Sequence, residues 1–102
     1  MLNESFFVSE QIQEKTVKLA DGSEHILYFK ELPAIEFRKF ALAEQSENED
    51  VKAASVAKLV ASSLCEPDGK PAITFEKALQ LKASAMNAIF EAMLEVNGQK
   101  KA

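Results

Sequence analysis

The feature that most constrains the fold is a pair of short apolar segments on either side of Asp21-Gly22. Both segments, Thr16–Leu19 and His25–Phe29, are rich in the β-branched and aromatic residues that favour strands. Asp-Gly accepts the backbone angles that a tight hairpin turn requires. Side chains alternate along a strand, so the second strand is apolar on both faces. Because an isolated two-stranded ribbon is marginal in water, the sequence predicts a β-hairpin over residues 14–32 that packs against the segments after it.

The segment after the hairpin has the apolar periodicity of helices. Pro33 suits the first position of a helix, and the pattern predicts one from there to about Gln45. Ser46 and Glu49 have the spacing of a capping box, which predicts the start of a second helix. The second helix is expected to stop before a type I turn at residues 66–69. Its predicted buried stripe consists of Val56, Leu59, Val60 and Leu64.

A third helical region is predicted after Pro71, with Thr74 as its cap. Its apolar positions recur mostly at three or four residues: Phe75, Ala78, Leu79, Met86, Ile89, Phe90, Met93 and Leu94. Leu81–Ser84 interrupts this register. One continuous helix and a short helix followed by a longer one are therefore both compatible with the sequence. Asn97-Gly98 is predicted to end the region.

These segments predict an α+β fold that is mainly α, with an N-terminal β-hairpin packed against three or four helices. The length of 102 residues fits one domain. We divide it into an N-terminal segment 1–13, the hairpin 14–32, a helical region 33–98 and a frayed tail 99–102. The N-terminal segment is expected to dock as a strand or short helix through its apolar residues, which are Phe6, Phe7, Val8 and Ile12.

Charge and cysteine content narrow the functional classes. Twelve Lys and Arg against sixteen Asp and Glu give a net charge of -4, which argues against a nucleic-acid-binding surface. The single cysteine, Cys65, cannot form an internal disulfide, so a reducing compartment is expected, with the cytoplasm as the default. The first residues lack the basic front of a signal peptide, and no apolar stretch is long enough to span a membrane. We expect a soluble protein.

The residues available for catalysis or metal binding are few. His25 and Cys65 could act as base and nucleophile only if the fold brought them together. The alternative, which the sequence favours, is a partly exposed strand histidine and a small core cysteine. Zinc-ligand spacings are absent from the sequence. We therefore expect no enzyme activity, no metal site, no cofactor and no small-molecule substrate.

An interaction surface is the most plausible functional feature that remains. The helices carry more apolar positions than a small domain with one hairpin can easily cover, and methionine adapts to varied partners. The residues predicted to bind another protein are Phe37, Phe40, Met86, Phe90 and Met93. The alternative is that these side chains simply pack on one another in the core.

A series of modest motifs gives the chain a family resemblance over residues 14–98. The motifs are FKELP at 29–33, SLC at 63–65 followed by DGKP at 68–71, LQLK at 79–82 and EVNG at 95–98. Together they resemble the tail assembly chaperones of long-tailed bacteriophages and prophages. The chain departs from that pattern at Ala83, where relatives often have a proline.

The resemblance implies a non-enzymatic protein of the bacterial host cytoplasm. It implies that the chain binds the tape measure protein during assembly, with the tail tube protein as a second expected partner, and is absent from the mature virion. Homo-oligomers are also expected. Two other classes stay open from the sequence: a structural head-tail or tail subunit retained in the virion, and a small cytoplasmic adaptor or enzyme unrelated to phage.

Overall fold

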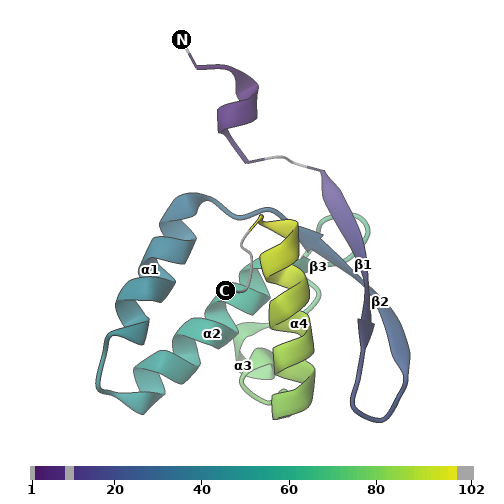
Figure 1. Ribbon diagram of the computed structural model, residues 1–102, viewed down its shortest axis with the longest axis vertical. Coiled ribbons are helices and arrows are strands. Elements are labelled where there is room, and N and C mark those ends of the chain that lie inside the picture. The colour runs from purple at the N-terminus through teal and green to yellow at the C-terminus, as the bar shows by residue number, and fades with distance from the viewer. Residues whose placement is uncertain (1, 9–10, 99–102) are drawn as a thin grey trace.

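The computed structural model describes residues 2–8 and 11–98. This part of the chain contains a three-stranded antiparallel sheet and four α-helices, which confirms the α+β, mainly α fold. Figure 1 shows the helices gathered on one side of the twisted hairpin. In chain order the elements are the 3-10 helix η1 (Glu4–Phe6), β1 (Ile12–Lys18), β2 (Glu24–Lys30), α1 (Ala34–Glu44), α2 (Glu49–Ser63), β3 (Leu64–Cys65), α3 (Phe75–Ala78) and α4 (Ala83–Val96).

The hairpin forms where the sequence predicts it, but its turn is a three-residue loop. The backbone N–H of Leu19 donates to the carbonyl of Ser23 at 2.9 Å, and that of Gly22 donates to the carbonyl of Leu19 at 3.0 Å. Gly22 has a φ of 90°, whereas no non-glycine residue in the described ranges has a positive φ. The loop therefore needs a single residue with left-handed backbone angles, and glycine adopts them without strain. A two-residue type I′ turn would need two such residues.

The third strand was not predicted from the sequence. β3 pairs antiparallel with β2, placing Leu64 opposite Phe29 and Cys65 opposite Tyr28. We expected Leu64 to lie on the buried stripe of the second helix, but α2 ends one residue earlier. Two residues are too few to show the alternation that identifies a strand. The turn that follows is confirmed, since the N–H of Gly69 donates to the carbonyl of Glu66 at 2.8 Å.

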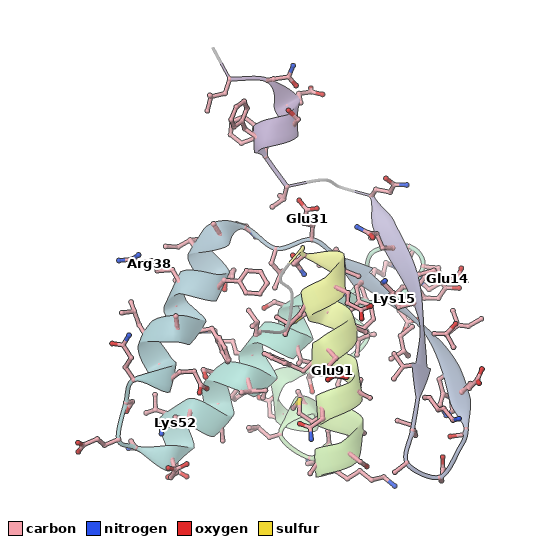
Figure 2. The ribbon with its side chains drawn as sticks, viewed as in Figure 1. Glu14, Lys15, Glu31, Arg38, Lys52 and Glu91 are labelled. Carbon is pink, nitrogen blue, oxygen red and sulfur yellow. The ribbon has the colours of Figure 1, made fainter. Side chains whose placement is uncertain are left out.

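The core lies between the sheet and the helices. Phe29 from β2, Val60 from α2 and Met93 from α4 are completely buried. An ion pair of 3.2 Å between Lys15 and Glu95 links β1 to α4, and Figure 2 shows Lys15 beside α4. The core cluster as a whole comprises Val17, Phe29, Leu32, Leu59, Val60, Leu64, Ile89, Ala92, Met93 and Val96.

The first two helices lie close to their predicted spans, but the residue that caps the second helix differs from the prediction. α1 begins after Pro33 and ends at Glu44. The cap of α2 is Asn48, whose side-chain oxygen accepts from the N–H of Asp50 at 2.9 Å. The predicted capping box at Ser46 is therefore wrong, because the Ser46 hydroxyl instead accepts from the N–H of Asn48 at 3.1 Å. The asparagine lies two residues closer to the helix and competes successfully for its free amides.

The third helical region divides into a short and a longer helix, which resolves the alternative that the sequence left open. Thr74 caps α3 as predicted, with its hydroxyl accepting from the N–H of Lys77 at 3.2 Å. α4 begins at Ala83 and ends with Asn97 as its C-terminal cap. Gly98 follows with a φ of 71°, which is the left-handed conformation common after a helix.

The N-terminal segment is expected to dock as a strand or a short helix. Ile12 does so as the first residue of β1, where it pairs with Lys30, but residues 2–8 with the short helix η1 do not dock on the body. Residues 2–8 are exposed throughout, and Figure 1 shows them rising away from the helices. Phe6 and Phe7 remain 70% and 63% exposed. Among the described residues, the hydrogen bonds of this segment join near neighbours only, and its aromatic rings stay exposed. The predicted frayed tail, 99–102, lies outside the described residues.

Candidate binding surface

An apolar strip joins α1 to α4. On α4 the half-buried side chains follow one another every four residues, which places them on one face of the helix. On α1 the two half-buried phenylalanines are three residues apart and therefore neighbours. We call this the apolar strip, and its members are Phe37, Phe40, Met86, Phe90 and Leu94, all packed against the core.

The contact between Phe40 and Phe90 connects the two helices. Their ring centroids lie 5.6 Å apart with the planes tilted by 44°, an arrangement typical of attractive aromatic pairs. Beside this pair, a hollow of about 480 Å³ opens along α4 and is lined by Asn87, Phe90, Glu91 and Leu94. The inner side of the strip thus packs against the core, while its outer side is open to another molecule.

Four of the five predicted binding residues belong to the strip, and the fifth does not. Phe37, Phe40, Met86 and Phe90 are each half-buried. Met93 is 0% exposed and lies in the core, so its predicted place on the surface is wrong. On α4 it lies on the face with Ile89 and Val96, which packs against the sheet and α2. The sequence interpretation left out Leu94, although its four-residue spacing from Phe90 could have identified it.

The outer face of α1 adds further exposed apolar groups. No residue of α1 is buried, and Ile35 and Leu42 are 55% and 58% exposed. They are seven positions apart, so they share a face of the helix with Arg38 between them. Figure 2 shows Arg38 projecting away from the body. α1 therefore keeps apolar surface that is available for contact.

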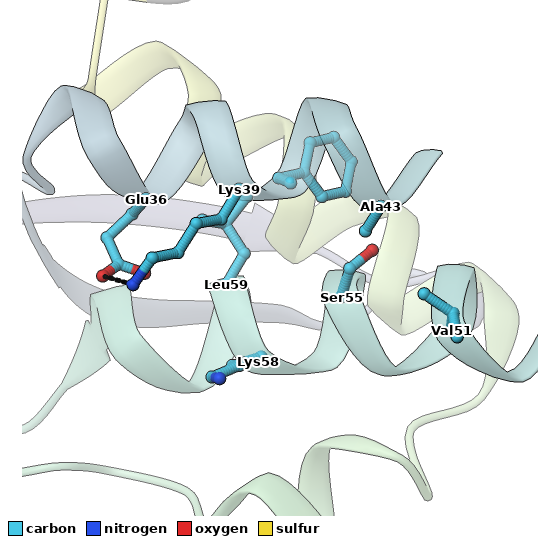
Figure 3. Close-up of a pocket in the computed structure, with 8 residues that line it drawn as sticks. Glu36, Lys39, Ala43, Val51, Ser55, Lys58 and Leu59 are labelled. Carbon is cyan, nitrogen blue, oxygen red and sulfur yellow. Dashed lines mark ion pairs between the residues drawn. The ribbon is translucent and has the colours of Figure 1, made fainter. Parts of the chain in front are cut away.

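A groove runs between α1 and α2 and encloses about 220 Å³. We call it the α1/α2 groove (Figure 3). Its apolar lining consists of Phe40, Ala43, Val51 and Leu59, and Ser55 lies opposite Ala43. Phe40 therefore faces both this groove and the apolar strip. Periodicity in the sequence could not reveal the groove, because it depends on how far apart two helices pack.

The rim of the α1/α2 groove carries a net positive charge. Glu36 and Lys39 form a weak ion pair at 3.9 Å, which Figure 3 marks as a dashed line. Lys58 lines the groove from the α2 side, and its ammonium group forms no ion pair with the described part of the chain. One cation is thus left to attract an acidic group.

His25 and Cys65 do not come together. Cys65 is opposite Tyr28 in the sheet, and paired side chains lie on the same face. His25 is three residues from Tyr28 along β2, so its side chain is on the other face. His25 instead contacts the hydroxyl of Ser23, with 3.0 Å between Nε2 and Oγ. The thiol–imidazole pair that the sequence left open does not form.

Two local environments shift the acidity of side chains. The pKa of Asp21 is lowered, chiefly because the Ser23 hydroxyl donates to its carboxylate at 2.6 Å, with the Ser23 N–H adding a second bond at 2.9 Å. Burial raises the pKa of the Cys65 thiol. Both shifts follow from structure within the hairpin and β3, away from the apolar strip.

Metal and membrane features were sought among the described residues. Within 2–8 and 11–98, no group of three His, Cys, Asp or Glu side chains is placed to hold a metal ion. No helix in these ranges combines the length and apolar character needed to cross a bilayer. Comparison of the chain with protein-family models, curated protein sequences and solved structures found no match.

Proposed function

We propose that the chain is a phage tail assembly chaperone, a non-enzymatic protein that binds the tape measure protein and keeps it soluble during tail assembly. The observation that carries the proposal is the half-buried apolar strip around Phe40 and Phe90. The motif resemblance over residues 14–98 supports it. Under this proposal the chain acts in the cytoplasm of the bacterial host and is absent from the finished virion.

The strip suits a client that is a long amphipathic helix. An apolar helix stripe can lie against another apolar surface with anchors at every third or fourth residue. The net charge of -4 on the chaperone would keep the complex soluble. Because the strip is half covered by its own core contacts, each copy has limited apolar area to offer.

We expect the chain to bind its client with modest affinity. The tail tube must displace the chaperone, so each contact has to be reversible. Several copies along one client strengthen the binding through high local concentration without requiring tight individual contacts. Under this proposal the tube protein competes for the client, and we include it as a second expected partner.

Co-expression with the tape measure protein tests the proposal. We expect the wild-type chain to hold the client in the soluble fraction and the Phe90→Ser variant to lose most of this effect while still folding. Phe75→Ser is the matched control, because Phe75 is a phenylalanine on α3 outside the strip. A folded Phe90→Ser variant that protects the client as well as the control does would refute the role of the strip.

Two further observations bear on the phage assignment. A major tail protein gene just upstream and a very long tape measure gene just downstream are the expected neighbours. We expect mass spectrometry of purified particles not to detect the chain. Finding it at stoichiometric levels in the virion would point instead to a structural tail or head-tail subunit.

A further inference from the structure

The N-terminal arm, which we define as residues 2–8, presents apolar side chains that the other described residues leave exposed. Leu2, Phe6, Phe7 and Val8 are 61%, 70%, 63% and 41% exposed. Adjacent exposed aromatic and aliphatic groups of this kind mark a contact site. In Figure 1 the arm stands clear of the helices, where a second molecule can reach it.

Hydrogen bonds between near neighbours fold the arm into a turn, and the arm carries one charged side chain. The side-chain oxygen of Asn3 accepts from the N–H of Ser5 at 3.0 Å, and the N–H of Phe7 donates to the carbonyl of Glu4 at 3.0 Å. These bonds form the η1 turn that carries the two phenylalanines. Glu4 is the one charged side chain in residues 2–8, so the arm is an aromatic segment with an acidic group.

The α1/α2 groove has the complementary properties. Its volume of about 220 Å³ is below the range of about 300 to 1,000 Å³ in which small-molecule ligands bind, but it can accept one aromatic side chain. The lining offers the ring of Phe40 and the aliphatic groups of Val51 and Leu59. Lys58 at the rim supplies the unpaired cation.

We propose that the N-terminal arm of one copy docks in the α1/α2 groove of a second copy. One phenylalanine of the Phe6-Phe7 pair enters the groove against Phe40, and Glu4 pairs with Lys58 at the rim. The charge complementarity and the fit of one ring to the groove favour this occupant. A seven-residue arm buries less area than a standard stable interface of about 1,200 to 2,000 Å², so the association is weak and concentration-dependent.

Sedimentation velocity between about 10 µM and 1 mM measures the association. We expect the wild-type chain to shift from monomer toward dimer or larger species over this range. Phe6→Ser with Phe7→Ser weakens association by about tenfold or more, since buried aromatic anchors dominate such contacts. Ala43→Phe, which fills the groove, has a similar effect. Lys77→Glu is the control for charge, because Lys77 is exposed on α3 and outside the groove.

Charge exchange tests the pairing directly. Glu4→Lys and Lys58→Glu each weaken association by about two- to fivefold, as expected for an exposed ion pair, and the double variant restores it. Both residues are exposed, so the substitutions leave folding intact. Failure of the double variant to recover association would overturn the Glu4–Lys58 pairing and with it the proposed docking geometry.

A spin label distinguishes a second copy from the arm's own body. Natural-abundance Ser5→Cys chains carrying a nitroxide are mixed with ¹⁵N-labelled wild-type chains. We expect concentration-dependent broadening of the amide signals of Val51, Ser55 and Leu59 in the ¹⁵N chains. A second sample has the nitroxide and ¹⁵N on the same chain. If the signals broaden only in this sample, the arm docks within its own molecule and the proposal is overturned. A chain that remains monomeric at 1 mM, with no broadening, would also overturn it.

Discussion

The side-chain oxygen of Asn97 accepts a hydrogen bond from the backbone N–H of Leu32, with 2.6 Å between Oδ1 and N. The same side chain donates to the carbonyl of Met93 at 2.9 Å. Leu32 is 8% exposed and lies between β2 and α1. One residue at the end of α4 therefore holds the connection that leads from the hairpin into the helices.

Replacing Asn97 with alanine should destabilise the fold by about 1 to 2 kcal/mol, because it leaves the amide of Leu32 without its partner in a largely buried position. Urea unfolding measures the loss. Asn87→Ala is the matched control, since Asn87 is an exposed asparagine on the same helix. Equal stabilities for the two variants would show that the Asn97 bond contributes nothing.

Met93 and Phe90 should respond differently to truncation. Met93→Ala creates a cavity in the core and should cost about 2 to 5 kcal/mol in the free energy of unfolding. Phe90→Ala loses its partial burial and its ring contact with Phe40, for which we expect about 1 to 2 kcal/mol. Urea unfolding of both variants gives the comparison. A larger loss for Phe90→Ala would mean that the strip is more deeply packed than the structure shows.

Acid should destabilise the hairpin through Asp21. Its pKa is lower in the folded chain than the ordinary value of 3.8 because Ser23 donates to the ionised carboxylate. A lowered folded-state pKa means that this contribution is fully present above the ordinary pKa and is lost as the pH falls through the folded one. Asp21→Asn should therefore reduce the fall in melting temperature between about pH 5 and pH 2. Glu47→Gln, at an exposed carboxylate ahead of α2, is the control. An unchanged pH profile in Asp21→Asn would contradict the role of this bond.

Cys65 should be protected from thiol reagents. It is 2% exposed, and burial raises its pKa, so little thiolate forms and the reagent cannot reach it. We expect modification by a disulfide reagent such as DTNB to be slow in the native state and to accelerate in urea in step with unfolding. A second thiol placed by Ser84→Cys, at an exposed position of α4, should react rapidly under native conditions. Rapid reaction of Cys65 itself would show that β3 opens in the native state.

The sequence predicted the features that depend on local chemistry and missed those that depend on packing. The hairpin, the start of α1 directly after Pro33 and the Thr74 cap all follow from nearby residues, and each is confirmed. β3 is only two residues long, so no periodicity marks it, and pairing with β2 defines it. At the start of α2 the capping-box spacing pointed to Ser46, whereas the side chain of Asn48 caps the helix.

For the candidate surface too, the sequence predicted some features and missed others. Helical spacing correctly placed Phe40, Phe90 and their neighbours on apolar faces. It could not distinguish the face of α4 that packs inward at Met93 from the edge that stays half open at Phe90, because both recur at three or four residues. The α1/α2 groove and the uncovered N-terminal arm depend on distances between elements, which a pattern along one chain does not contain.

The central claim is that the apolar strip covers an apolar stripe of another polypeptide. It is tested most directly by an NMR titration of the ¹⁵N-labelled chain with amphipathic helical segments of the tape measure protein. We predict saturable amide shifts concentrated around Phe37, Phe40, Met86, Phe90 and Leu94, with weak affinity for each segment and little change around His25 on the hairpin. Saturable binding that shifts only residues outside the strip, or no shifts at any segment concentration up to about 1 mM, would contradict the claim.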